Sequence, residues 1–358
     1  MSKIVIIGAG KTGRGYLARL LKESEKEICF VDKNETLVKE LQEKKEFKIH
    51  FFGGEREDFV IQKYSCCTWE EAEFGDVSLI LVSVGGSNLK EVGEALAARL
   101  TPDRHYDIIT CENSSRPAEV LKEAIGSGFD VSVSESTVFC TTIESEKEGL
   151  DINSENYPYL QCNGDLLPGF NSDIRGIRPM KEFGDFLTRK LYTYNAASCV
   201  LAYLGFLKGY TDYREAGRDP EILEKLDRNY EMTNSVLCEV YGYDPADQAE
   251  FAALSRSKFT SQTIVDTIDR NAREPQRKLK AGERIIGPMK LIFEKGILPD
   301  VLIETAAAAL KYDKGDEWLK IKGTHTPEEI LQEICGLKPS DFLYNEILKT
   351  YQKNSAVF

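Results

Sequence analysis

Residues 3–15 read KIVIIGAGKTGRG, and this stretch decides the fold of the first half of the chain. The run KIVIIG lacks helical periodicity and ends at a glycine, which is typical of a buried parallel strand. Gly8, Gly10 and Gly13 then form a Gly-x-Gly-x-x-Gly pattern, and an amphipathic stretch follows over residues 14–26. A strand, a glycine turn and a helix in this order predict a Rossmann-type unit that binds a dinucleotide.

Each glycine of this pattern is expected to serve the dinucleotide in its own way. Gly8 permits the tight turn, Gly10 lets the pyrophosphate approach the backbone, and Gly13 lets the helix pack closely on the strand. The N–H groups and the positive dipole end at the start of the helix stabilise the phosphates. Lys11 and Thr12 lie at this start and are therefore candidate cofactor-binding residues.

The acid after the next predicted strand indicates which dinucleotide binds. That strand covers residues 27–31 and ends at Asp32, about twenty residues beyond Gly13, where the motif places its ribose-binding acid. A carboxylate there accepts hydrogen bonds from the ribose hydroxyls and repels a 2′-phosphate. We therefore expect NAD as the cofactor, although the cation of the neighbouring Lys33 weakens the repulsion of NADP.

Strand and helix patterns continue to alternate through the first half. Strand patterns occupy residues 77–84, 107–111, 131–141 and 157–162, and helical patterns occupy residues 35–45 and 89–100. Residues 47–67 alternate around Gly53 and Gly54, which predicts an inserted antiparallel hairpin. The whole pattern predicts an α/β fold with a doubly wound sheet, whose ligand crevice lies at the carboxyl ends of its strands.

Two of these strand ends place further residues at the nicotinamide end of that crevice. Val84 and Gly85 close one strand, and Asn113 follows another. Asn113 is therefore a candidate site residue. Its position fits equally well an asparagine that caps the helix starting near Pro117 or that turns the loop.

Near residue 177 the pattern changes to long helical periodicity that lasts to the C-terminus. We therefore predict two domains, an NAD-binding Rossmann domain over residues 1–176 with the inserted hairpin, and a mostly α-helical substrate-binding and catalytic domain over residues 177–358. The helix over residues 183–207 is so apolar that we expect it to be buried between domains or at a subunit contact.

That helix carries three polar residues, Lys190, Asn195 and Ser198. On an ideal α-helix Lys190 and Asn195 are offset by roughly 140°, so one face holds both only if the helix bends or unwinds between them. Asn195 and Ser198 share a face. Taken alone, the pattern favours a solvated lysine and a hydrogen-bonded core asparagine.

A basic cluster stands out in the second half of this acidic chain. Residues 270–284 read RNAREPQRKLKAGER and include Arg273, Arg277, Lys278 and Arg284. Such cations bind phosphate or carboxylate oxygens, so the cluster is interpreted as a site for an anionic substrate or for ion pairs between subunits. A solvated loop is the alternative.

The composition excludes several classes of protein. A net charge of −13 opposes binding to nucleic acid and leaves a small molecule as the expected partner. The apolar runs are far shorter than the ~20 residues that span a bilayer, and the N-terminus lacks the layout of a signal peptide. Nine scattered cysteines and three histidines predict neither a disulfide framework nor a zinc site. We expect a cytoplasmic protein that works without a bound metal.

Four blocks of the chain resemble one known family. These are residues 8–15 (GAGKTGRG), 109–113 (ITCEN), 189–205 (RKLYTYNAASCVLAYLG) and 273–288 (REPQRKLKAGERIIGP). The first is shared by many dehydrogenases, whereas the third and fourth are specific. Together they resemble the metal-independent long-chain polyol dehydrogenases, the mannitol dehydrogenase family, over nearly the whole chain.

The resemblance implies an NAD-dependent oxidoreductase with a defined catalytic core. Lys190 would remove the proton of a secondary alcohol as hydride leaves its carbon. Asn113 and Asn195 would donate hydrogen bonds to the developing alkoxide and so replace the zinc of other alcohol dehydrogenases. The fourth block matches the branch that acts on sugar phosphates. It implies a substrate pair such as mannitol 1-phosphate and fructose 6-phosphate, bound by Arg273, Arg277, Lys278 or Arg284.

Two departures from the family leave alternatives open. The family has a histidine where this chain has Ser198, and it has a Val-Asp-Arg-Ile-Val-Pro-like stretch where residues 134–139 read SESTVF. Serine still forms hydrogen bonds but does not titrate near neutral pH. The alternatives are a hexuronate reductase of the same wider family, and a protein that binds NAD but no longer catalyses. The oligomeric state is left open.

Overall fold

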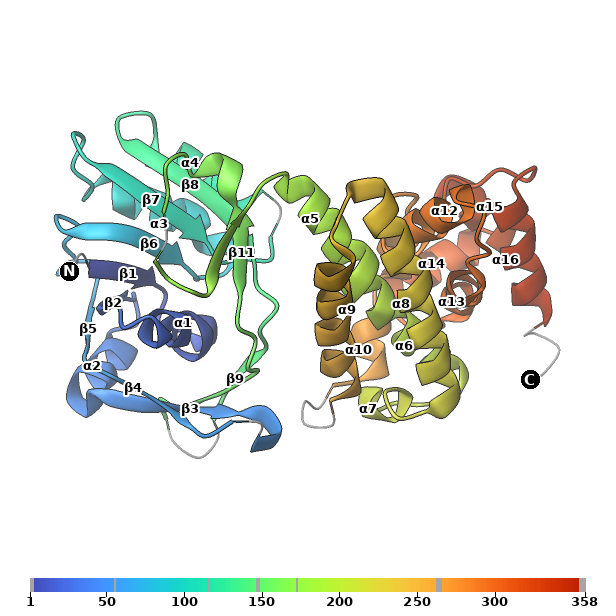
Figure 1. Ribbon diagram of the computed structural model, residues 1–358, viewed down its shortest axis with the longest axis horizontal. Coiled ribbons are helices and arrows are strands. Elements are labelled where there is room, and N and C mark those ends of the chain that lie inside the picture. Colours follow the sequence, from blue (N-terminus) through green and yellow to red (C-terminus); the bar gives the residue numbers. More distant parts are fainter. Residues whose placement is uncertain are drawn as a thin grey trace. The chain divides into compact units, whose positions relative to one another are not determined.

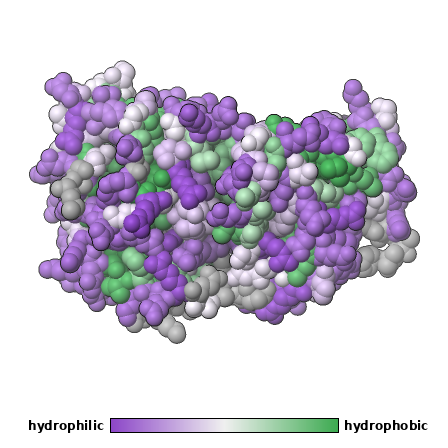
Figure 2. All heavy atoms as spheres, viewed as in Figure 1, coloured by the Kyte–Doolittle hydropathy of each residue, from purple (hydrophilic) through white to green (hydrophobic). Residues whose placement is uncertain are grey.

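The structure is a computed structural model that describes residues 3–54, 56–114, 116–145, 149–171, 173–261 and 266–353. The chain divides into two compact units, Met1–Phe183 and Gly184–Phe358. On the face drawn in Figure 2, hydrophilic side chains cover most of the surface. Within the described residues, no helix has both the length and the apolar character needed to cross a bilayer.

The first unit is built on an eight-stranded sheet (Figure 1), with the strand order β12-β11-β8-β7-β6-β1-β2-β5. The strands are β1 (Lys3–Ile7), β2 (Ile28–Val31), β5 (Tyr64–Cys67), β6 (Val77–Val82), β7 (His105–Thr110), β8 (Asp130–Thr137), β11 (Leu160–Asn163) and β12 (Ile177–Met180). From β8 to β5 all neighbours pair in parallel, and β11 joins β8 in the antiparallel direction. This confirms the predicted Rossmann-type sheet.

Alternating side chains of the strands bury both faces of this sheet. Val5 and Ile7 share a hydrophobic core with α3 (Leu89–Ala97) and α4 (Pro117–Ile125) on one face. Ile6 points to the other face, where the first helix packs against β1. Because successive side chains of a strand point to opposite faces, the apolar run of β1 requires helices on both sides.

The first helix is not a regular α-helix over its whole length. A π-helical turn, η1 (Gly13–Leu17), precedes α1 (Ala18–Glu23), and the N–H of Ala18 donates to the carbonyl of Gly13. The predicted helices at residues 35–45 and 89–100 are confirmed as α2 (Glu35–Lys44) and α3.

A second, four-stranded sheet has the order β4-β3-β10-β9. Its strands are β3 (Glu46–Phe51), β4 (Phe59–Gln62), β9 (Thr142–Glu144) and β10 (Ile152–Ser154). β3 and β4 form the predicted antiparallel hairpin. The prediction was wrong for residues 64–67, which form β5 at the edge of the main sheet. A half-exposed edge strand alternates in the same way as a hairpin strand, so the pattern alone does not separate them.

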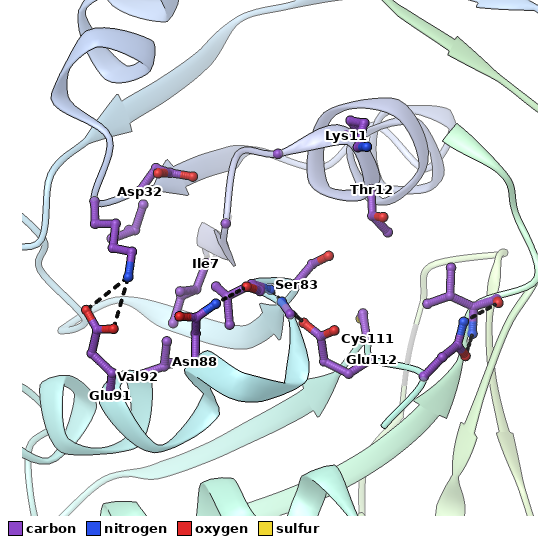
Figure 3. A pocket seen from close by; sticks show the side chains of 18 of the residues that line it. Ile7, Lys11, Thr12, Asp32, Ser83, Asn88, Glu91, Val92, Cys111 and Glu112 are labelled. Atoms are coloured by element: carbon purple, nitrogen blue, oxygen red, sulfur yellow. Dashed lines mark hydrogen bonds and ion pairs between the residues drawn. The ribbon is translucent and has the colours of Figure 1, made fainter. Parts of the chain in front are cut away.

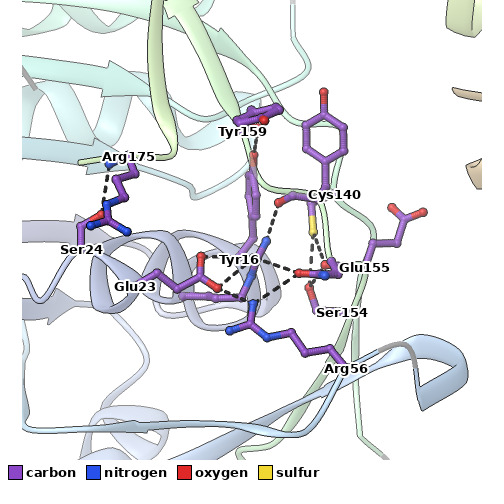
Figure 4. A network of polar contacts seen from close by, with 12 residues as sticks. Tyr16, Glu23, Ser24, Arg56, Cys140, Ser154, Glu155, Tyr159 and Arg175 are labelled. Atoms are coloured by element: carbon purple, nitrogen blue, oxygen red, sulfur yellow. Dashed lines mark hydrogen bonds and ion pairs between the residues drawn. The ribbon is translucent and has the colours of Figure 1, made fainter. Parts of the chain in front are cut away.

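Polar contacts join the first helix to the second sheet and to the segment before β11 (Figure 4). Tyr16 donates a hydrogen bond to the carbonyl of Tyr159, and Glu23 pairs with Arg56 at 2.5 Å. These contacts hold the helix that carries the glycine turn against two segments that are distant in sequence.

The second unit is helical. Its helices are α5 (Phe183–Lys190), α6 (Ala196–Leu207), α7 (Tyr213–Ala216), α8 (Pro220–Tyr241), α9 (Pro245–Thr260), α10 (Ile268–Ala272), α11 (Pro275–Lys278), α12 (Ile286–Glu294), α13 (Asp300–Lys311), α14 (Asp316–Thr324), α15 (Pro327–Glu333) and α16 (Phe342–Lys353). This confirms the predicted helical second half. The strand β12 still belongs to the first sheet, so the division at residues 183 and 184 lies a few residues beyond the predicted boundary.

The most apolar helix, α6, is central to this second unit. It packs against α7, α8, α10 and α13, and its side chains from Val200 to Tyr203 are fully buried. The apolar character that we attributed to a domain or subunit contact is therefore explained by the core of its own unit.

Candidate functional site

A cavity of about 500 Å³ opens at the carboxyl ends of β1, β2, β6 and β7 (Figure 3). β1 lies between β2 and β6, so this is the point where the strand order reverses and where doubly wound sheets bind ligands. The cavity is lined by Ile7, Gly8, Gly10, Lys11, Thr12, Val31, Asp32, Lys33, Trp69, Ser83, Val84, Gly85, Asn88, Glu91, Val92, Cys111, Glu112, Asn113 and Val138. Of the predicted cofactor-binding residues, Gly13 alone is not part of this wall.

The three motif glycines meet different surroundings. A Cβ on Gly8, which has φ +98°, would lie 2.1 Å from the carbonyl oxygen of Ser83, and a Cβ on Gly13 would lie 2.0 Å from that of Gly8. A Cβ on Gly10 would meet no protein atom within 4 Å. Gly8 and Gly13 are therefore required by the protein itself, whereas Gly10 leaves open space in the cavity for a ligand.

The acid at the end of β2 is held in place by backbone groups. One carboxylate oxygen of Asp32 accepts from the N–H of Ala9 at 2.7 Å, and the other accepts from the N–H of Asn34 at 2.8 Å. The cation of Lys33 is 3.0 Å from the carboxylate of Glu91, and both side chains are exposed. Because Glu91 balances that cation, Lys33 offers little attraction to a 2′-phosphate.

We expect Asp32→Asn to weaken the preference for NAD over NADP. The amide oxygen still accepts from Ala9, but the charge that repels a 2′-phosphate and strengthens the ribose hydrogen bonds is lost. Charge-assisted hydrogen bonds contribute about 1.5–3 kcal/mol, so the ratio of kcat/KM for NAD to that for NADP should fall roughly 10- to 100-fold. Glu35→Gln, in the first turn of α2, is the exposed control. An unchanged ratio in Asp32→Asn would remove the assigned role.

At the other end of the cavity, Glu112 holds the loop that follows β6. Its Oε1 accepts from the N–H groups of Val84 at 2.6 Å and of Gly85 at 2.7 Å. Burial raises the pKa of this carboxyl, and the two backbone N–H groups oppose that rise. Glu112 thus fixes the shape of this wall, a role that its position after a strand did not reveal.

Asn113 lies beside it and binds the segment after β8. Its Nδ2 donates to the carbonyl of Val138 at 3.1 Å, and its Oδ1 accepts from the N–H of Val138 at 3.3 Å. The N-cap of α4 is Arg116, so Asn113 does not cap that helix. An amide nitrogen carries two hydrogens, which leaves a second one for another acceptor.

The segment that departs from the family pattern is mostly internal. Ser134 and Ser136 are buried in β8, where the hydroxyl of Ser136 donates to the carbonyl of Thr110 at 2.8 Å. Only Val138 of residues 134–139 lines the cavity. Most of this departure therefore affects the strand and not the wall of the cavity.

Several wall residues were not found by motif reasoning. Trp69, Asn88, Glu91 and Val92 line the cavity without belonging to a recognised binding motif. Asn88, Glu91 and Val92 lie at the start of the helical segment after β6, and the rule that ligands bind beyond the carboxyl ends of strands could have found them.

In the second unit, a π-helical turn brings Lys190 and Asn195 onto one face. The turn η5 (Leu191–Asn195) separates α5 from α6, and the N–H of Ala196 donates to the carbonyl of Leu191 five residues earlier. The turn adds one residue, so Lys190 and Asn195 are placed like an i, i+4 pair with an offset of about 40° instead of about 140°. The helix interruption that the predicted pairing required is present.

The surroundings of Lys190 favour its neutral form. Burial, followed by the cations of Lys258 and Arg284, lowers the pKa of Lys190 to about 8. A lysine with such a pKa is uncharged in part of the population near neutral pH and accepts a proton readily. Lys258, on α9, was not predicted as part of this site, because nothing in its local sequence separates it from a surface lysine.

Ser198 lies one turn beyond Asn195. Tyr213 is buried, and its hydroxyl lies 3.3 Å from both the Oγ and the carbonyl oxygen of Ser198. Burial is the main reason that the pKa of Tyr213 is raised. Ser198 therefore has a polar partner of its own within the helical unit.

The four predicted substrate-binding cations differ in their surroundings. Arg273 is exposed, and Arg277 pairs with Glu274 at 2.8 Å. Lys278 is buried, its ammonium group donates to the carbonyl of Asn271, and burial lowers its pKa to about 8. Arg284 is the one whose charge acts on Lys190.

Within the parts of the chain that the structure describes, no group of three or more His, Cys, Asp or Glu side chains is arranged to hold a metal ion. The nine cysteines are free thiols, and most of them are buried.

The chain matches two domain models of one known family. The Mannitol dehydrogenase Rossmann domain matches residues 2–143, and the Mannitol dehydrogenase C-terminal domain matches residues 182–325. Mannitol-1-phosphate 5-dehydrogenase of Bacillus velezensis is 28% identical, over 96% of this chain and 97% of that protein. Mannitol-1-phosphate 5-dehydrogenase of Bacillus pumilus is 29% identical, over 97% of this chain and 99% of that protein.

Solved structures share the fold at low identity. A D-sorbitol dehydrogenase superposes with a TM-score of 0.76 at 14% identity, over 98% of this chain and 92% of that one. A second solved structure is a Pseudomonas fluorescens mannitol 2-dehydrogenase in a ternary complex with NAD and D-mannitol. It superposes with a TM-score of 0.62 at 14% identity, over 99% of this chain and 91% of that one. The chain therefore belongs to the mannitol dehydrogenase family and is an NAD-dependent polyol oxidoreductase.

Proposed function

We propose that the protein interconverts a secondary alcohol and a ketone of a phosphorylated sugar alcohol, with Lys190 as the general base. The observation that carries the proposal is the π-turn that aligns Lys190 with Asn195, together with the lowered pKa of Lys190. Relatives named mannitol-1-phosphate 5-dehydrogenase, similar over nearly their full lengths, support a mannitol 1-phosphate and fructose 6-phosphate pair.

The proposed chemistry divides the two hydrogens of the alcohol group. Held in the cavity that Gly10 and Asp32 line, NAD would supply the acceptor for the hydride that leaves the carbon. Lys190, in its neutral form, accepts the hydroxyl proton, so that a ketone, a reduced cofactor and a protonated lysine result. Asn195 donates a hydrogen bond to the oxygen while negative charge develops there. In the reverse direction the protonated Lys190 returns the proton.

The same cations that lower the pKa of Lys190 support an anionic substrate. Arg284 has a planar fork of donors suited to phosphate oxygens. Lys278 lies close enough to both Arg284 and Arg277 for their charges to act on it. Arg284 is therefore the first candidate for the phosphate ligand, with Lys278, Arg277 and Arg273 around it.

The test is NADH oxidation with fructose 6-phosphate, unphosphorylated fructose and a keto-hexuronate. We expect fructose 6-phosphate to give the highest kcat/KM. In Arg284→Gln, the KM for fructose 6-phosphate should rise roughly 10- to 100-fold, because a charged hydrogen bond to the phosphate is lost. The KM for fructose should stay within about twofold. Arg228→Gln, at an exposed position of α8 outside the basic cluster, is the control.

Other outcomes assign another function. Preference for the keto-hexuronate would identify a carboxylate substrate held by the same cations. Intact NAD binding with no turnover of any of the three would favour a protein that binds NAD without catalysis.

A further inference from the structure

We propose that Gln248 is a positioning residue that holds the π-turn between Lys190 and Asn195. The inference rests on the proposed function, because it explains how the base and the hydrogen-bond donor come to share one face. Gln248 lies on α9, far from the turn in sequence.

Gln248 uses its whole amide within the helical unit. It is fully buried, and its Oε1 accepts from Nε of Arg189 at 2.6 Å. Its Nε2 donates to Oγ1 of Thr193 at 3.3 Å and to Oδ1 of Asn234 at 2.7 Å. One side chain thus binds the residue directly before Lys190 and a residue inside the turn.

Arg189 is itself held firmly by α9. Its guanidinium is only 3% exposed and lies 2.8 Å from the carboxylate of Asp247, while its NH2 donates to the backbone carbonyl of Asp247 at 2.9 Å. The rings of Tyr243 and Phe251 lie against the same group, with centroids 4.6 and 4.4 Å away. A buried charge with this many partners is costly to move, so the backbone before Lys190 has a fixed position.

The hydrogen bond to Thr193 depends on the register of the helix. Thr193 is fully buried within η5. If the turn relaxed to a regular α-helix with Arg189 in place, residues after it would rotate by about 100° relative to Lys190. Asn195 would then leave the face of Lys190. A contact made in one of two states shifts the population toward that state, so Gln248 favours the π-turn over the regular helix.

The experiment compares Gln248→Met, Thr193→Val and the double variant in the full-length protein, with D-mannitol 1-phosphate and NAD as probes. Gln248→Met removes the amide at similar volume, and Thr193→Val removes only the hydroxyl. Ser255→Ala is the matched control. Ser255 is a fully buried polar residue of α9 whose Oγ lies 2.8 Å from the hydroxyl of Tyr230 on α8.

We expect Gln248→Met to lower kcat roughly 10- to 100-fold, because small displacements of catalytic groups have effects of this size. The Kd for NAD should stay within about twofold. The pH midpoint of alcohol oxidation should move up from about 8, because a displaced Lys190 is more hydrated. The kcat of the double variant should be no lower than that of the less active single variant. The reason is that Thr193→Val removes only the hydrogen bond that Gln248→Met removes as well. Ser255→Ala should keep the kcat and the midpoint of the unmodified protein.

A purely structural glutamine would lower thermal stability without moving the pH midpoint, and that result would overturn the inference. Additive losses in the double variant would overturn it as well. If Gln248→Met does not fold, Thr193→Val decides the question. An unchanged kcat and an unchanged pH midpoint in Thr193→Val would overturn the inference. The proposed function fails separately, through unchanged turnover in Lys190→Met.

Discussion

Lys190→Met is expected to lower kcat for oxidation of mannitol 1-phosphate by NAD roughly 10²- to 10⁴-fold, the usual contribution of a general base. Methionine fills a similar volume and accepts no proton. The Kd for NAD should stay nearly unchanged, because the residues of the dinucleotide cavity belong to the first unit.

The pH dependence gives the same prediction an independent readout. The pKa of Lys190 is lowered to about 8 by burial and by the cations of Lys258 and Arg284. Oxidation requires the neutral amine, so its rate should rise with pH through a midpoint near 8. Reduction requires the ammonium form, so its rate should fall as the pH rises through the same midpoint. Lys190→Met should show neither dependence.

A matched control is Lys290→Met, on α12 of the same unit, which should keep turnover and both pH profiles. Lys258→Met should raise the midpoint while leaving most of kcat, because it removes a cation that disfavours the protonated base. Retained turnover in Lys190→Met would eliminate the proposed base.

Gly10→Ala and Gly8→Ala are expected to abolish NAD binding for different reasons. A Cβ on Gly10 meets open space in the protein, so the variant should keep its thermal stability while its Kd for NAD rises about 100-fold or more, because the methyl group occupies the place of the pyrophosphate. A Cβ on Gly8 lies 2.1 Å from the carbonyl oxygen of Ser83 at a backbone angle of φ +98°. That strain costs roughly 1–3 kcal/mol before any clash, so the variant should also lose stability.

Calorimetry with NAD and thermal unfolding of both variants check this pair. Gly282→Ala, at a position without positive φ and with no protein atom within 4 Å of the new Cβ, is the control for the substitution itself. Tight NAD binding in Gly10→Ala would show that the ligand does not approach this backbone. Unchanged stability in Gly8→Ala would contradict the argument from φ and from the distance to Ser83.

Some parts of the fold were less predictable from local patterns. β5 follows the hairpin and alternates as a hairpin strand does, yet it pairs with β2 at the edge of the main sheet. The apolar sequence of α6 is the same whether its neighbours come from its own unit or from another. In the structure, α6 packs against α7, α8, α10 and α13 of its own unit. In both cases the partner, which the local pattern does not contain, decides the placement.

The amino-acid sequence by itself determined that Gly8, Gly10 and Asp32 meet at one cavity, because the decisive features are short-range. Gly8, Gly10 and Gly13 lie within one six-residue segment, and Asp32 directly follows the adjacent strand, so a parallel sheet and a helix start are enough to bring them together. The alignment of Lys190 with Asn195 was decided only by the tertiary structure. On an isolated helix the two residues diverge, and the π-turn that aligns them is contacted by a buried glutamine from α9.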